Sequence, residues 1–244
     1  NMIAAATALN DELNEFAQAL SWLDTLKKNH TLGEVVVPTP EIVELAERYA
    51  DLSGRARAIG TAKKKAVALL TTASESQPDL LEVLFKPSVS VDRTAFSVDL
   101  VKTKFPNLYE EFKTLRKPSI TPKIVVKASD TPDDDYLQSL GLMTADALDA
   151  LSNDPYGLHQ QYLAIWGAEE ATKWDQWIIE ARLHLEAMQR SGIEGILEWD
   201  EKVSTTFDRE AFLEKHPELE EECLKTRPGK LSYAVAEWAA YPTA

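Results

Sequence analysis

The chain carries one pattern of residues twice. Residues 96–126 read FSVDLVKTKFPNLYEEFKTLRKPSITPKIVV, and residues 207–235 read FDREAFLEKHPELEEECLKTRPGKLSYAV. When the two segments are aligned on Pro106 and Pro217, these pairs coincide: Phe96 with Phe207, Ser97 with Asp208, Val101 with Phe212, Lys104 with Lys215, and Leu108 with Leu219. An internal duplication of this kind predicts two copies of one small structural unit.

Each copy has the composition of a strand, a helix and a second strand. Ser97 and Asp208 are predicted to cap the two helices, because their side chains can accept a hydrogen bond from a free backbone N–H. A proline inside a helix removes a backbone donor, so Pro106 predicts two short helices and opens the second one. Residues 80–85, 88–96, 120–127, 195–207 and 230–238 are rich in branched and aromatic side chains and are predicted to be extended.

Two other regions have the apolar spacing of long helices. The first region contains a helix over residues 2–29, followed by one that starts at Pro40 after the capping residue Thr39. These two are predicted to form an antiparallel hairpin. The second region runs from about residue 134 to 190. Its predicted apolar seam consists of Trp174, Ile178, Ala181, Leu185 and Met188.

We therefore expect a mainly helical α+β fold, in which long antiparallel, coiled-coil-like helices accompany two small strand–helix–strand units. The expected divisions are a helical hairpin at 1–77, a first αβ unit at 78–128, a second helical region at 129–191 and a second αβ unit at 192–244. The helical seams also predict self-association as a homodimer, unless the two halves of one chain cover them.

The charge is distributed unevenly along the chain. The formal net charge is −14, and residues 1–128 contribute +1 whereas residues 129–244 contribute −15. Such an acidic half either keeps the protein in solution or imitates the charge of a nucleic acid. No run of 18 apolar residues occurs, so no membrane span is expected. The single cysteine, Cys223, is typical of a reducing cytoplasm.

The sequence offers little for catalysis. It contains no GxSxG, Walker or GxGxxG motif, and we expect no cofactor, no metal and no enzymatic activity. The best candidate for a catalytic group consists of Glu198, Asp200 and Lys202. These residues alternate along a predicted strand and therefore share one face. Restriction-like nucleases place an acidic residue and a lysine two apart on such a strand, together with an upstream aspartate, to hold a divalent metal and orient water. The same residues equally describe a strand edge that charge protects from aggregation.

Two charged clusters are candidate interaction sites. A basic run on the second predicted helix could follow a phosphate backbone, or pair with acidic groups of the same or another molecule. It consists of Arg55, Arg57, Lys63, Lys64 and Lys65. Further basic residues border the first αβ unit at Arg116, Lys117, Lys123 and Lys127. The acidic cluster lies in the second copy and consists of Glu218, Glu220, Glu221 and Glu222.

The repeated segments SVDLVKTKFPNLYEEFKTLRKP and FDREAFLEKHPELEEECLKTRP resemble a small module of bacteriophage early and recombination-associated proteins. The plan of long helices with small αβ units is similar, in architecture, to the Gam-type host-nuclease inhibitors. The resemblance implies a phage origin and a role near DNA recombination or the control of host nucleases.

Three functions follow as hypotheses. The first is a phage-encoded, non-enzymatic protein in the cytoplasm of the infected bacterial host, which binds a host nuclease or defence complex through an acidic, nucleic-acid-like surface. The second is a DNA-binding recombination accessory that uses residues 55–65. The third is a metal-dependent nuclease that uses Glu198, Asp200 and Lys202.

Overall fold

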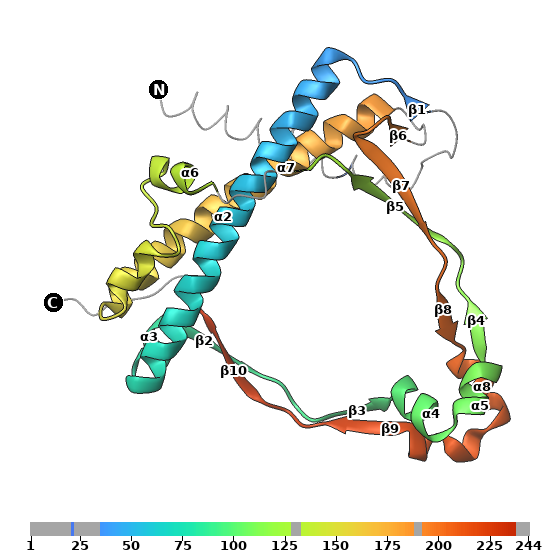
Figure 1. Ribbon diagram of the computed structural model, residues 1–244. Coiled ribbons are helices and arrows are strands. Elements are labelled where there is room, and N and C mark those ends of the chain that lie inside the picture. The colour runs from blue at the N-terminus through green and yellow to red at the C-terminus, as the bar shows by residue number, and fades with distance from the viewer. Residues whose placement is uncertain (1–20, 22–34, 128–132, 188–191, 238–244) are drawn as a thin grey trace, which may run out of the picture. The chain divides into compact units, whose positions relative to one another are not determined.

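The computed structural model describes residues 21, 35–127, 133–187 and 192–237 (Figure 1). The fold is mainly helical α+β, as predicted. The chain divides into two compact units. Unit 1 holds the described residues of 1–84, 121–200 and 235–244, and unit 2 holds 85–120 and 201–234. Each unit therefore combines segments that are distant in the sequence.

Unit 1 is built on two long helices, α2 (Pro40–Ser76) and α7 (Pro155–Ala187), which lie side by side and run antiparallel (Figure 1). The predicted start of α2 is confirmed, because the Thr39 hydroxyl accepts a hydrogen bond from the Ile42 N–H at 3.4 Å. The start of α2 and the end of α7 share a core, which includes Ile42, Ala46, Leu52, Ile179, Leu183 and Ala187. The predicted hairpin partner at residues 2–29 lies outside the described residues.

The buried face of α7 differs from the predicted seam. Trp174 and Leu185 are 37% and 41% exposed, so the prediction is wrong for these two residues. Met188 lies outside the described residues. The side chains that are buried instead include Leu158, His159, Tyr162, Ile165, Thr172, Ile179, Leu183 and His184. The sequence of α7 is apolar on more than one side, and two histidines and a threonine lie on the buried one. Apolar spacing alone therefore indicates the stripe that contains Trp174 and Leu185, which is not the buried face of α7.

Smaller elements complete unit 1. They include α3 (Leu80–Leu84), α6 (Asp134–Ser139), the 3-10 helix η1 (Ala147–Leu151), and a four-stranded sheet in the order β1 (Val35–Val36), β6 (Gly192–Ile193), β7 (Leu197–Lys202) and β5 (Ser119–Ile124). Residues 80–84 were predicted to be extended, and this is wrong. Leu80 and Leu84 are both buried and stand four residues apart, which is a helical spacing.

Unit 2 contains the two copies of the repeat. The first copy supplies β3 (Arg93–Phe96), α4 (Val98–Lys104), α5 (Pro106–Glu111) and β4 (Lys113–Leu115). The second supplies β8 (Thr205–Phe207), α8 (Arg209–Lys215), the 3-10 helices η2 (Pro217–Leu219) and η3 (Glu221–Cys223), and β9 (Leu224–Arg227). The strand β2 (Phe85–Val89) precedes the first copy, and β10 (Leu231–Val235) forms the end of the second. The predicted helix break at Pro106 is confirmed, and β3, β5, β8 and β10 coincide with segments predicted to be extended. The strands β4 and β9 lie outside those segments and were not predicted.

The two copies exchange strands. The strand before the helices of each copy pairs antiparallel with the strand directly after the helices of the other, β3 with β9 and β8 with β4. Phe96 stands opposite Leu224, and the equivalent Phe207 stands opposite Lys113. The backbone repeats this relation, because Ser97 N–H donates to the Cys223 carbonyl and Asp208 N–H donates to the Phe112 carbonyl, each at 2.8 Å. The copies are thus related by an approximate two-fold axis.

The core of unit 2 lies between the copies and not within either one. Its buried residues are Val101, Phe112, Phe212 and Cys223. In the sequence alignment Val101 corresponds to Phe212, and Phe112 corresponds to Cys223. The ring centroids of Phe112 and Phe212 are 5.5 Å apart at an interplanar angle of 88°, an edge-to-face contact. The duplication visible in the sequence therefore builds one shared core.

Candidate nucleic-acid interface

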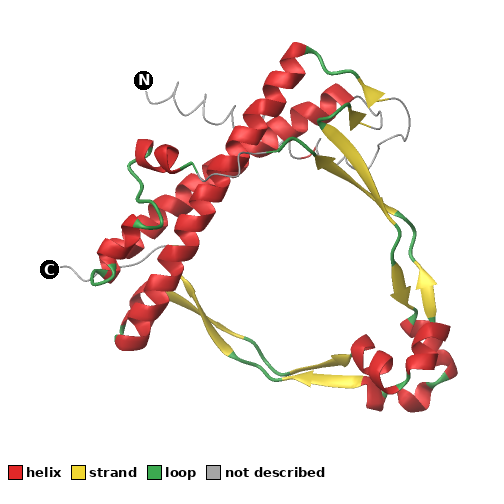
Figure 2. Cartoon of the chain, in the orientation of Figure 1, coloured by secondary structure: helices red, strands yellow, loops and turns green. Residues whose placement is uncertain are grey.

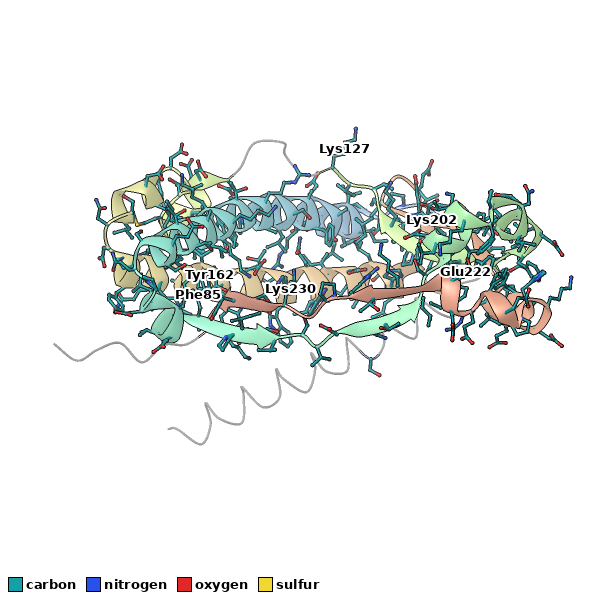
Figure 3. All side chains as sticks on the ribbon, turned by 90° about the horizontal axis from the view of Figure 1, so that it is seen from below. Phe85, Lys127, Tyr162, Lys202, Glu222 and Lys230 are labelled. Atoms are coloured by element: carbon teal, nitrogen blue, oxygen red, sulfur yellow. The ribbon has the colours of Figure 1, made fainter. Side chains whose placement is uncertain are left out.

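Unit 2 separates its charges according to secondary structure. We call residues 85–96, 113–120, 201–207 and 224–234 the ribbon segments; they contain nine Lys and Arg but only two Asp and Glu. The helical segments, 97–112 and 208–223, contain four Lys and Arg and ten Asp and Glu. The short helices gather together and the strands extend away from them (Figure 2). Figure 3 labels Glu222 at the helical end of the unit and Lys230 away from it, in the connection between β9 and β10.

Three of the four cations of the helical segments, Lys104, Arg209 and Lys215, form ion pairs within the unit. Lys104 Nζ lies 4.0 Å from a Glu222 carboxylate oxygen, and Lys215 Nζ lies 3.3 Å from one of Glu111. These two ion pairs are equivalent under the duplication and each joins one copy to the other. They are exposed, so each contributes at most about 1 kcal/mol to stability.

Most cations of the ribbon segments have no such partner. Lys113 pairs with Glu110 at 3.2 Å. Within the described part of the chain, these seven side chains form no ion pair: Lys86, Arg93, Arg116, Lys117, Lys225, Arg227 and Lys230. Arg93 even stands directly opposite Arg227 in the β3/β9 pair. Like charges in that position destabilise a strand pair, so the ribbon tolerates a cost that an anionic ligand would remove.

Hydrogen bonds from backbone N–H groups join the two chain segments where the β2/β10 pair continues into the β3/β9 pair. Ser90 N–H donates to the Lys230 carbonyl at 3.0 Å, and Gly229 N–H donates to the Asp92 carboxylate at 2.7 Å. A Cβ at Gly229 would lie 2.2 Å from the Ser90 carbonyl oxygen, which explains the glycine at this position. Asp92, one of the two acidic residues of the ribbon segments, thus accepts a hydrogen bond from a backbone N–H and is engaged there instead of with a ribbon cation.

The predicted basic run lies on α2 in unit 1 and is largely engaged in ion pairs. Arg55 pairs with Asp51 at 2.8 Å, Lys63 with Glu169 at 2.5 Å, and Lys65 with Asp149 at 2.7 Å. Arg57 also interacts within the molecule, and Lys64 is exposed. Burial alone would raise the pKa of Glu169, but the hydrogen bond and charge of Lys63 outweigh it and lower that pKa. The run was predicted either to follow a phosphate backbone or to pair with acidic groups, and the structure shows ion pairs with acidic groups of the same molecule.

The candidate nuclease residues lie on β7. Glu198, Asp200 and Lys202 alternate along the strand and are exposed. Among the described residues, no three His, Cys, Asp or Glu side chains come together in a way that could hold a metal ion. The nuclease hypothesis stays a prediction without a described metal site.

The predicted acidic cluster lies in η2 and η3 and in the residues beside them. Glu220 lies 3.6 Å from Arg209, and Glu218 lies 3.3 Å from His216 Nδ1. Cys223 follows at the buried end of η3, where burial raises the pKa of its thiol. The cluster therefore borders the core of unit 2 and is partly paired with cations of the same unit.

Six ribbon cations did not stand out in the sequence, namely Lys86, Arg93, Lys113, Lys225, Arg227 and Lys230. A count of charges by half of the chain hides the last three, because they lie in the acidic half. A count by predicted element does not find them either, because Lys225 and Arg227 lie outside the segments predicted to be extended.

Comparison of the chain with protein-family models, with curated proteins and with solved structures gave no match. No helix in the described part of the chain combines the length and the apolar character that a bilayer crossing needs.

Proposed function

We propose that this protein is a non-enzymatic nucleic-acid-binding protein, and that the ribbon segments of unit 2 hold the phosphate backbone. The observation that carries the proposal is the charge of these segments, nine cations against two anions, with seven of the cations outside any ion pair of the described residues. Clustered Lys and Arg bind phosphates with a gain from released counterions. The major groove of DNA also admits a two-stranded β-ribbon.

The spacing of the cations suits a phosphate backbone. Lys225 and Arg227 lie on β9, and Lys230 lies in the connection between β9 and β10. At about 3.3 Å per residue of extended chain, the five steps from Lys225 to Lys230 span at most about 16 Å. One DNA strand carries a phosphate about every 3.4 Å along the helix axis. The three side chains can therefore reach phosphates within about half a turn of duplex, and they read no base sequence by this contact.

A salt titration tests the proposal. Fluorescence anisotropy of an internally labelled duplex should show affinity that falls steeply with salt, and a log–log slope of about −0.9 for each phosphate contacted. The double variant Lys86→Glu with Lys230→Glu should weaken binding and reduce the slope by about 2.

The matched control reverses two exposed charges on the helices of unit 1, Lys64→Glu with Arg182→Glu. It should change the affinity little. Equal losses in the two variants would assign the interface to the helices, and an absence of binding at low salt would end the proposal.

A second candidate rests on the acidic side of the same molecule. The helical segments of unit 2 carry ten acidic against four basic residues, and unit 1 carries 28 against 13. The acidic excess of the helical segments of unit 2 supports the hypothesis of a phage protein that binds a host nuclease or defence complex in the bacterial cytoplasm. Capture from a host lysate should then lose its specific partner when Glu218 and Glu221 become Gln. Capture that is insensitive to this change and to salt would speak against charge mimicry.

A further inference from the structure

The β3/β9 ribbon forms a pocket of about 220 Å³ that lies entirely within unit 2. Its lining consists of Arg93, Ala95, Phe96, Ser97, Lys225 and Arg227. Three cations thus share one small cavity, and none of the lining residues is acidic.

The strand register explains why the cations meet there. Arg93 stands opposite Arg227, and Ala95 stands opposite Lys225. Since side chains alternate along a strand, these four residues project from one face of the ribbon. The small side chain of Ala95 leaves room beside Lys225. The other face is held by Thr94 and Thr226, whose hydroxyls are 2.8 Å apart.

The duplicated ribbon, β4/β8, provides an internal comparison with the same pairing. At the positions of Arg93, Lys225 and Arg227 it has Ser204, Thr114 and Arg116. Its single arginine donates a hydrogen bond to the Thr206 hydroxyl at 3.2 Å. Both ribbons have the equivalent register, so the triple charge comes from the side chains of β3 and β9.

We infer that the β3/β9 pocket binds a phosphate monoester, as carried by the end of a nucleic-acid strand. A phosphodiester within a strand carries one negative charge, whereas a monoester carries close to two at neutral pH. Two guanidinium groups and one ammonium group supply charge-assisted donors for such a dianion. The Ser97 hydroxyl, which makes no capping bond to α4, adds a further donor at the pocket wall. This inference rests on the proposed function and gives it a preference for strand ends.

The experiment compares three duplexes that differ only at their ends and carry an internal fluorophore. One has 5′-hydroxyl ends, one has 5′-phosphates, and one has 5′-phosphates esterified with propanol, which keep the phosphate but lose its second charge. The 5′-phosphate duplex should bind about tenfold more tightly than the other two, as expected for one added charge-assisted contact. A parallel series with 3′-phosphates shows which end is preferred.

Arg93→Ser copies the residue of the duplicated ribbon and should remove the preference for phosphorylated ends. Arg116→Ala is the matched control, because it removes one charge from the other ribbon. It should weaken binding of all duplexes and keep the preference. Millimolar inorganic phosphate should displace the terminal phosphate from the pocket and so remove the preference for phosphorylated ends, while binding of the 5′-hydroxyl duplex stays unchanged. It should also raise the melting temperature of the wild-type protein but not that of Arg93→Ser.

The failures are distinguishable. Equal affinity for the three duplexes would overturn the inference and leave the proposed function standing. A preference that survives Arg93→Ser would also overturn it, since the site would lie elsewhere. No binding of any duplex would refute the proposed function itself.

Discussion

Phe112 offers a test of the shared core, because it belongs to the first copy while its ring contacts lie in the second. The centroids of Phe212, His216 and Phe207 are 5.5, 5.8 and 6.4 Å away. Phe112 is only 5% exposed. The variant Phe112→Ala should therefore destabilise the second copy as strongly as the first.

The size of the effect follows from the volume removed. Replacing a buried Phe by Ala costs about 3–5 kcal/mol through lost transfer energy and the cavity left behind. At about 1.4 kcal/mol for each tenfold change, the opening equilibrium of unit 2 should rise by about 100-fold to about 4,000-fold.

Cys223 reports this opening directly. It is the single cysteine of the chain, it is fully buried, and it belongs to the second copy. A thiol reagent reacts with it only when unit 2 opens, so the labelling rate follows the opening equilibrium as long as closing is faster than labelling. Val89→Ala is the control, because Val89 is 75% exposed and its truncation should leave the rate within about twofold.

A wild-type labelling rate in Phe112→Ala would refute the shared core. It would mean that the second copy keeps Cys223 protected without the first. The same rate increase in Val89→Ala would show that labelling responds to any change in unit 2.

Three further predictions concern single positions. Asp208→Ala should lower the free energy of unfolding by about 1 kcal/mol in urea titrations, because the carboxylate accepts the Ala211 N–H at 3.0 Å; Ser97→Ala should not, because Ser97 makes no capping bond. Burial lowers the pKa of His159 below its ordinary 6.5, although its hydrogen bond to a backbone carbonyl raises it. The unfolded chain then binds a proton that the folded chain does not, so stability should fall as the pH drops below about 6.5, and less so in His159→Gln. Gly229→Ala should lower the melting temperature, because its methyl group would collide with the Ser90 carbonyl; an unchanged melting temperature would contradict the close approach.

The local features of the repeat were predictable because they depend on neighbours in the sequence. A proline in a helix and a carboxylate before one act within a few residues, so the break at Pro106 and the cap at Asp208 were correct. The capping bond predicted for the Ser97 side chain is wrong. Leu80 and Leu84 were misassigned, since a short apolar run fits a strand as well as a buried helical turn.

The candidate interface was not predictable in the same way. Whether a lysine is available depends on partners that the fold supplies from far along the chain. Lys63 meets Glu169 across two helices, so an ion pair within the molecule engages part of the most conspicuous basic run. Arg93 and Arg227 become neighbours only because the copies exchange strands, which no local pattern encodes.

The exchange of strands has a consequence for how the protein could have diverged. A chain with a single copy would leave β3 and β4 without partners and half of the aromatic core exposed, and only a second identical chain could satisfy both. In such a symmetric dimer every substitution appears at both equivalent positions. Joining the copies in one polypeptide lifts that restriction and makes their association intramolecular. Arg93 can then face Arg227 on one ribbon while Ser204 faces Arg116 on the other. The two ribbons of an almost two-fold symmetric fold thus carry different charges.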